Sequence, residues 1–272
     1  MGQVVYTLPE GEYVCGVTSL GDEVFVLKSK EREEMEVYDV VTYRLVRCFD
    51  VPNARQFSDM TSCGHYHCVY IADPTVMCIH RVDVQGGATT QLAVNDKLSR
   101  LSVTKEHNVL ATCPVVRKIK EFNTHGKLLR QLTLPDDVIN PCHAMQLTTG
   151  QFVVCHGGPH DRVNRVCLMS EDGHNILHAH GGQRGSDLGQ YDGPYHLAID
   201  DNEFVFVADF DNRRVTLLSP TLNYVRQVVS HYQLKWDPRR LHLDVQRRRL
   251  YVAEGEFLDS EHSKGRVVVF NV

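Results

Sequence analysis

The chain alternates apolar and polar residues in short runs, and one stretch shows the pattern in full. "GPYHLAIDDNEFVFVADFDNRRVTLLS", from Gly193 to Ser219, contains an apolar strand, a turn, a second strand, a polar loop and a third strand. Alternation with a period of two, bounded by Gly, Asp and Asn, is typical of antiparallel strands joined by tight turns. The stretch therefore predicts a small all-β unit.

The same unit recurs along the chain. Its equivalent first residues are Cys15, Met60, Arg100, His143, His196 and Arg240. They lie 45, 40, 43, 53 and 44 positions apart, which is the period of a four-stranded propeller blade. Third strands such as "RVCLMS" and fourth strands such as "LVRCFDV" follow within the units. The spacing predicts a single all-β domain over residues 1–272, a six-bladed β-propeller of four-stranded antiparallel blades.

The sixth unit reaches Val272 without a fourth strand of its own. An uncovered sheet edge would leave backbone donors and acceptors unpaired, and proteins normally cover such edges. The segment "QVVYTLP" at residues 3–9 precedes the first unit and alternates well enough to serve as a strand. We expect residues 3–8 to pair with residues 266–272, so that the N-terminal strand completes the last blade and closes the ring.

The stretch from Gly193 to Ser219 resembles an NHL repeat, whose pattern is roughly G-P-x-G-I-A-V-D, then I-Y-V-A-D, then N-x-R-I. The match is partial in "HCVYIADPTVMCIHRV" and "PRRLHLDVQRRRLYVAE", and His196 stands where the family most often has Gly. Propellers of this family often end tripartite-motif proteins. The resemblance thus implies a non-catalytic module that recruits protein or RNA to a ubiquitin ligase.

The candidate binding surface lies where the inner strands begin, because the loops between second and third strands emerge on that same face. The two longest of these loops, 155–165 and 254–265, flank the short loop 209–214, and long loops on a rigid scaffold usually carry recognition. The candidate binding residues are Arg100, His143, His156, His160, Arg162, Tyr195, His196, Phe210, Arg213, Arg239 and Arg240. Arg214, the Arg of the N-x-R pattern, is expected to tie neighbouring blades together.

These polar residues have a second interpretation, in which they plug the mouth of the channel by bonding to one another and to water. For a binding surface, a protein partner is the first choice, because acidic runs such as "EGEFLDSE" lie on the same face and give it mixed charge. RNA is the alternative, because Arg side chains beside Tyr195 and Phe210 would combine phosphate contact with base stacking.

Fifteen histidines raise two metal hypotheses. One involves Cys63, His65, His67, Cys68, Cys78 and His80. Their spacing matches no zinc-finger pattern, and alternate side chains of a hairpin point to opposite faces. The other places His143 and His196 together in the channel, which resembles the zinc-dependent amidating lyases. Arg100 and Arg240 hold the equivalent positions there, and their permanent charge disfavours a cation. We therefore expect neither a metal nor a cofactor.

Composition narrows the functional classes further. A formal charge of -5 gives no positive field over the whole domain, and no apolar run is long enough to cross a bilayer, so no membrane partner is expected. The nine cysteines are scattered through apparent strands, and no signal-peptide pattern begins the chain, so we expect reduced thiols and a cytoplasmic location. Neither a catalytic constellation nor a glycine-rich phosphate loop is found, which argues against an enzyme.

Overall fold

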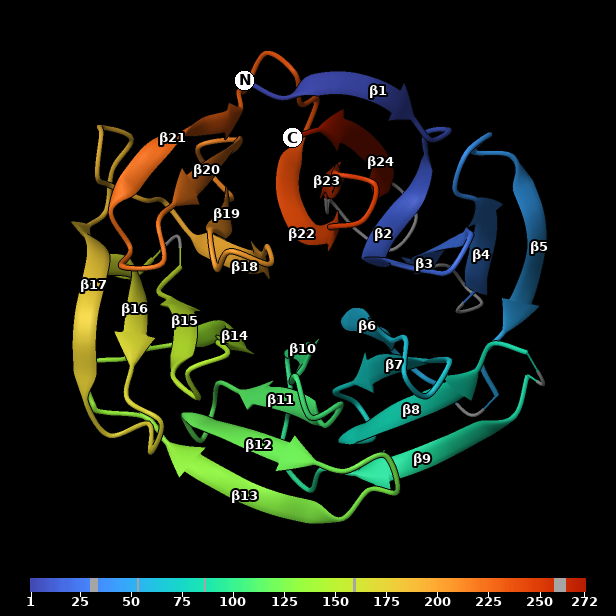
Figure 1. The fold of residues 1–272 in the computed structure, drawn as a ribbon, viewed down its shortest axis with the longest axis horizontal. Helices are drawn as coiled ribbons and strands as arrows, with labels where there is room; N and C mark the ends of the chain where they lie inside the picture. The colour runs from blue at the N-terminus through green and yellow to red at the C-terminus, as the bar shows by residue number, and fades with distance from the viewer. Residues whose placement is uncertain (30–33, 53, 86, 159, 257–262) are drawn as a thin grey trace.

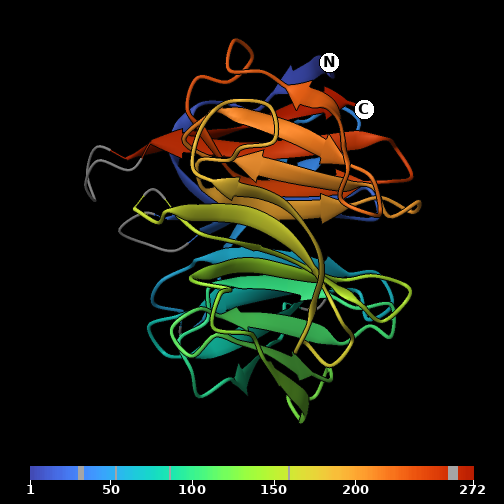
Figure 2. The same ribbon diagram turned by 90° about the vertical axis from the view of Figure 1, so that its left-hand side faces the viewer.

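The computed structural model describes residues 1–29, 34–52, 54–85, 87–158, 160–256 and 263–272. In this part of the chain every regular element is a β-strand, and the strands are arranged in sheets around a central axis (Figure 1). In the side view the strands run through the thickness of the ring, so that the turns of each sheet lie on its two faces (Figure 2). The described residues contain no helix that could cross a membrane.

Four sheets stand as separate four-stranded antiparallel blades. The first consists of β6 (Asp59–Cys63), β7 (Cys68–Asp73), β8 (Cys78–Asp83) and β9 (Thr89–Ala93). The second consists of β10 (Arg100–Val103), β11 (Val109–Cys113), β12 (Lys118–Phe122) and β13 (Leu128–Thr133). The third consists of β14 (Pro141–Gln146), β15 (Phe152–His156), β16 (Val163–Met169) and β17 (Ile176–Gln183). The fourth consists of β18 (Pro194–Ile199), β19 (Val205–Asp209), β20 (Arg214–Leu218) and β21 (Tyr224–Val229).

The remaining strands form one eight-stranded sheet. One half consists of β2 (Gly11–Leu20), β3 (Glu23–Ser29), β4 (Glu34–Asp39) and β5 (Leu45–Asp50). The other half consists of β22 (Asp237–Asp244), β23 (Arg249–Glu256), β24 (Lys264–Asn271) and β1 (Gln3–Thr7). The repeat predicts six four-stranded blades; the structure has four such blades and this joined sheet.

The two halves of the eight-stranded sheet are joined by a short contact between β2 and β24. β2 begins at Gly11, before the predicted start at Cys15, and its first two residues pair with β24 as Gly11↔Gly265 and Glu12↔Lys264. A Cβ on Gly265 would lie 2.8 Å from the backbone nitrogen of Val14, closer than real Cβ contacts come. The glycine thus allows β24 to approach β2 closely enough to hydrogen-bond, which joins the two halves.

The N-terminal strand lies against β24, as Figure 1 shows near the two chain ends. The pairs are Gln3↔Asn271, Val4↔Phe270, Tyr6↔Val269 and Thr7↔Val268, with a bulge between Val4 and Tyr6. The Leu8 N–H continues the contact by donating to the Val267 carbonyl at 2.9 Å. Residues from the two ends of the chain therefore share one sheet.

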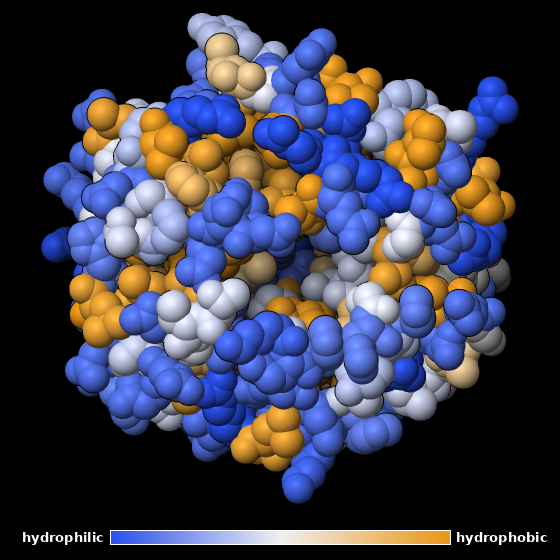
Figure 3. All heavy atoms as spheres, in the orientation of Figure 1, coloured by the Kyte–Doolittle hydropathy of each residue, from blue (hydrophilic) through white to orange (hydrophobic). Residues whose placement is uncertain are grey.

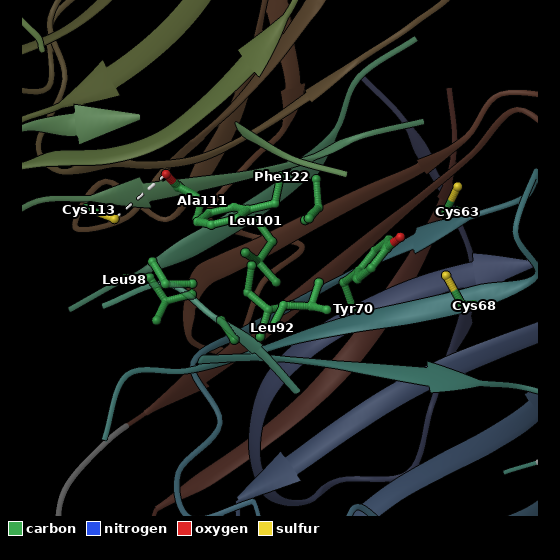
Figure 4. Close-up of a cluster of buried hydrophobic side chains, with 13 residues drawn as sticks. Cys63, Cys68, Tyr70, Leu92, Leu98, Leu101, Ala111, Cys113 and Phe122 are labelled. Atoms are coloured by element: carbon green, nitrogen blue, oxygen red, sulfur yellow. Dashed lines mark hydrogen bonds between the residues drawn. The ribbon is translucent and has the colours of Figure 1, made fainter. Parts of the chain in front are cut away.

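The core consists of apolar clusters between adjacent sheets. One of them joins β6–β9 to β10–β12 and includes Tyr70, Leu92, Leu101 and Phe122, all buried (Figure 4). Because strand side chains alternate between faces, each sheet has apolar residues for both of its neighbours. The inner strands β2, β6, β10, β14, β18 and β22 contact one another in that order, and β22 contacts β2. Their first residues meet at one end of the central channel, where the candidate site lies.

Candidate functional site

The structure divides the predicted site residues into two groups. The buried group consists of Arg100, His143, His156, His196 and Arg240. The accessible group consists of Tyr195, Phe210 and Arg239, which are half-buried, and His160, Arg162 and Arg213, which are exposed. Of the two predicted long loops, residues 159 and 257–262 lie outside the described residues.

A β-bulge explains why adjacent residues of one strand differ in this way. The pairing of β18 with β19 shifts between Pro194 and His196, so Tyr195 is the extra residue. The pairing of β22 with β23 shifts in the same way between Pro238 and Arg240, which makes Arg239 the extra residue. Bulges change the direction of a side chain and often lie beside functional sites. Tyr195 and Arg239 are consequently half-buried at the channel mouth, while the next residue of each strand is buried.

The carboxylate of Asp59 lies at the centre of the buried group. Its Oδ2 accepts the N–H of Leu101 at 2.8 Å, and its Oδ1 lies 3.0 Å from Arg240 Nε and 3.4 Å from His196 Nε2. The last two are ion-pair distances without the alignment of good hydrogen bonds. Burial alone would raise the pKa of Asp59, but His196 and Arg240 outweigh it and hold that pKa well below the ordinary value. Asp59 is therefore ionised at neutral pH.

The two channel histidines lie stacked, with ring centroids 4.0 Å apart. His143 Nδ1 accepts the N–H of Leu197 at 3.1 Å, so its Nε2 carries the proton that faces the Leu101 carbonyl at 3.0 Å. His196 Nδ1 accepts the N–H of Leu241 at 3.3 Å. Burial lowers the pKa of both rings, which are thus neutral at pH 7. Each histidine links its own inner strand to the backbone of a neighbouring one.

One atom each from Asp59, His143 and His196 lie within 4.8 Å of one another, a spacing at which a metal ion could be held. The chemistry of the donors does not suit a cation. Both ring nitrogens of His143 are engaged by backbone groups, and the guanidinium of Arg240 already lies against Asp59. A cation would have to break these contacts beside a permanent positive charge. The geometry favours a hydrogen-bonded brace between blades over a metal site.

The fold divides the other cysteines and histidines of the metal hypotheses into separate groups, and Cys78 lies beside His80 with Sγ 3.5 Å from Nε2. Cys63 and Cys68 face each other across the β6–β7 hairpin, whereas His65 stacks on His107 with ring centroids 4.2 Å apart. His80 is buried 3.4 Å from Asp73. The hairpin therefore does not bring the four residues of "CGHYHC" together as one ligand set, in agreement with the alternation of strand faces.

Arg100 differs from Arg240 although both lie on inner strands at the same end of the channel and both are buried, with 6% and 4% of their surface exposed. Arg240 donates to the carbonyls of Arg239, at 2.7 Å, and Ser58, besides lying against Asp59. Arg100 Nη1 donates to the Ser99 carbonyl at 3.0 Å, and its guanidinium lies 4.5 Å from the ring centroid of Tyr195. Its Nε is buried without a hydrogen-bond partner.

Aromatic rings and arginines form the accessible part of the mouth. The guanidinium of Arg239 lies 4.6 Å from the ring centroid of Phe210 and 5.1 Å from that of Tyr13. Phe210 in turn lies 5.2 Å from Tyr195. We define the mouth surface as Tyr13, Tyr195, Phe210, Arg213 and Arg239. Tyr13 was not among the predicted residues, and it contributes because β2 begins earlier than predicted.

Two predicted residues have structural contacts within or beside a blade. Arg214 binds Asp209 at 2.7 Å and donates to the carbonyls of Ser186 and Gln190, both at 2.8 Å, so it ties its blade to the segment that leads out of the preceding one, as predicted. His156 accepts from Arg165 Nε at 2.8 Å, and burial lowers its pKa to about 4. His156 therefore lies within the third blade and does not line the predicted groove.

Beyond the histidines the inner strands enclose a cavity of about 190 Å³. Met60, Leu197 and Leu241 line it together with hydroxyl and imidazole groups of Ser62 and His242. The molecule is hollowed at the centre of the ring (Figure 3). His242 lies 2.8 Å from the Ser19 hydroxyl and accepts the Ser19 N–H at 3.0 Å, so its polar atoms are already partnered. This layer braces the inner strands in the same way as the histidines above it.

Comparison with known proteins identifies the fold class. No family model and no curated protein matches the chain. Among solved structures, virginiamycin B lyase from Staphylococcus aureus is 10% identical over 94% of this chain and 87% of that chain, with a TM-score of 0.62. The β-propeller domain of Cps50 (Swd1) from Myceliophteria thermophila is 10% identical over 100% of both chains, with a TM-score of 0.62. The PQQ-bound aldose sugar dehydrogenase from Streptomyces coelicolor is 13% identical over 99% and 98%, with a TM-score of 0.68. Identities this low show the fold alone, so the chain is an all-β propeller built of four-stranded antiparallel blades.

Proposed function

We propose that this chain is a non-catalytic binding module that recognises a protein partner through the mouth surface. The observation that carries the proposal is the position of Arg239 between the rings of Phe210 and Tyr13. A guanidinium held by two aromatic rings has little rotamer freedom left to lose on binding. Arg and aromatic residues are also the types that most often dominate the energy of protein interfaces.

The charge around the mouth surface favours a protein over RNA. Asp192, Asp211 and Asp237 lie close enough together to act on one another, and burial with these neighbours raises the pKa of Asp211 to about 6. Asp192 is paired with Arg184 at 2.7 Å, but Asp211 and Asp237 would repel a polyanion, and the net charge of -5 adds no attraction at long range. A peptide segment with both acidic and basic residues suits this mixed surface better.

We also infer that the eight-stranded sheet serves as the first and last of six blades, with β1 completing the last. Support comes from the closed sequence of contacts among the inner strands and from the narrow joint, in which two residue pairs of the described residues connect β2 to β24. A six-bladed ring with an NHL-like repeat suggests substrate recruitment for a tripartite-motif-type ubiquitin ligase. That role belongs to the proposal and rests on the resemblance of the repeat.

The test compares two double variants, each of which replaces one aromatic residue and one arginine by alanine. The two variants alter opposite ends of the blades. F210A/R239A removes an aromatic residue and an arginine from the mouth surface. Y66A/R248A also removes one aromatic residue and one arginine, but from the β6–β7 and β22–β23 turns, which lie at the opposite ends of the blade strands. Each immobilised protein is incubated with cell lysate, with and without RNase, and captured proteins are quantified by mass spectrometry.

We expect a set of proteins that wild type and Y66A/R248A retain, that F210A/R239A loses, and that RNase does not release. Capture lost on RNase treatment would indicate RNA as the ligand. Retention by F210A/R239A together with loss from Y66A/R248A would place the functional surface on the opposite face and overturn the proposal.

A further inference from the structure

The arginines at the channel mouth outnumber the carboxylates that they contact. Within the described residues, Arg240 has Asp59 at 3.0 Å, whereas Arg100 has no carboxylate within ion-pair distance. The two histidines of the layer, His143 and His196, are neutral at pH 7 because burial lowers their pKa. Asp59 acts on Arg100 only from beyond ion-pair distance, so this buried guanidinium has no carboxylate in direct contact.

A buried hydrogen-bond donor without an acceptor is costly for a folded protein. A buried charge needs a partner, and nearly all buried polar groups find a hydrogen bond. Arg100 Nε is buried with no acceptor, although the same guanidinium satisfies Nη1 on the Ser99 carbonyl. The donor is therefore available to an acceptor that comes from outside the chain.

The neighbour of Arg100 toward the accessible surface is Tyr195. Its ring lies 4.5 Å from the guanidinium of Arg100 and 5.7 Å from that of Arg240, and it is half-buried on the β18 bulge. Tyr195 also lies 5.2 Å from Phe210, which belongs to the mouth surface. A partner bound on the mouth surface would thus place its own groups beside Arg100.

We infer that Arg100, beside Tyr195, binds a single carboxylate of a partner peptide that rests on the mouth surface. This inference rests on the proposed function and names the group that is recognised. A carboxylate offers two oxygens in one plane, which matches the planar fork of a guanidinium. The acidic rim of Asp192, Asp211 and Asp237 disfavours a chain of phosphates and favours basic residues on either side of that carboxylate.

The test uses degenerate nonapeptide libraries with a fixed central residue. The first has a central Glu and an amidated end, the second a central Gln and an amidated end, and the third a central Gln and a free C-terminal carboxylate. Comparing the first and third with the second separates a side-chain carboxylate from a terminal one. A fluorescein-labelled single-stranded RNA 15-mer is the polyanion probe.

We expect wild type to retain the Glu library or the free-acid library about tenfold or more over the neutral library, as a charge-assisted hydrogen bond in a buried site provides. Retained peptides should be enriched in Lys and Arg beside the carboxylate. Arg100→Gln should abolish the preference, and Arg100→Lys, which keeps the charge but not the fork, should restore only part of it. Y66A/R248A should behave as wild type.

The outcomes separate this inference from the proposed function. Equal retention of all libraries by wild type, lost in F210A/R239A, would leave the mouth surface as the binding site and overturn the carboxylate. A preference that survives Arg100→Gln would also overturn it. Absence of binding to any library, or binding of the RNA alone, would overturn the inference, and RNA binding lost in F210A/R239A would overturn the protein partner as well.

Discussion

Arg100 and Arg240 provide a matched pair of substitutions whose effects on stability should differ in size. Each is changed to Met, which has a similar length and no charge. In Arg240→Met the carboxylate of Asp59 stays buried and keeps only the Leu101 N–H at 2.8 Å and the more distant His196. Removing one member of a buried ion pair costs about 3 kcal/mol or more. In a domain of this size that corresponds to a fall in Tm of about 6–12 °C.

Arg100→Met removes a charge that has no carboxylate in contact, and also the orphaned Nε. Tyr195 and Asp59 favour the charged form of Arg100, but no contacting carboxylate would be left buried without its partner. We expect the Tm of Arg100→Met to lie well above that of Arg240→Met, while its binding is lost.

Differential scanning fluorimetry at pH 7 and pH 4 provides the assay. In wild type, Asp59 has a lowered pKa, so its contribution is present at neutral pH and is lost as pH falls through the folded-state pKa. In Arg240→Met the pKa of Asp59 should rise from its wild-type position, because only His196 and Arg100 remain to oppose the effect of burial, so the deficit against wild type should shrink as pH falls toward 4. Equal destabilisation by both substitutions, or a deficit independent of pH, would refute this description of the charges.

Three further predictions concern the scaffold. Deleting residues 1–9 removes the strand that pairs with β24 and should lower Tm markedly; an unchanged Tm would contradict the ring closed by β1. Alkylation in denaturant followed by mass measurement should count nine free thiols in freshly prepared protein, and a reproducible bridge would show that the thiol prediction is wrong. Purified protein should contain no stoichiometric zinc, whereas zinc that is lost on changing His143 and His196 to Ala, with the fold intact, would restore the lyase hypothesis.

Periodicity alone located most of the strands. The predicted first residues Arg100, His143, His196 and Arg240 all lie in inner strands, because strand length and turn chemistry are local properties that a repeat makes visible. The joint between β2 and β24 could not be predicted in this way. It depends on how closely two backbones far apart in sequence approach at Gly265.

The candidate site could be predicted only as a set of positions around a ring. Sequence spacing brings Asp59 and Arg240 to the same end of the channel, but it does not say which side chains meet, and Asp59 was not among the predicted site residues. The bulges at Tyr195 and Arg239 are the second reason why the sequence did not predict which site residues are accessible. A single extra residue reverses which neighbour faces inward, so the predicted groove residue Arg240 is buried and Arg239 is accessible.

The most direct test of the central claim is the affinity of a captured protein partner for three forms of the chain, measured by isothermal titration calorimetry. F210A/R239A removes two residues of the types that dominate interfaces, each typically contributing about 2 kcal/mol when truncated at the centre of one. Allowing for incomplete additivity, Kd should rise at least about 30-fold. Y66A/R248A should stay within about twofold of wild type. A Kd for F210A/R239A within twofold of wild type, with an unchanged Tm, would contradict the assignment of binding to the mouth surface.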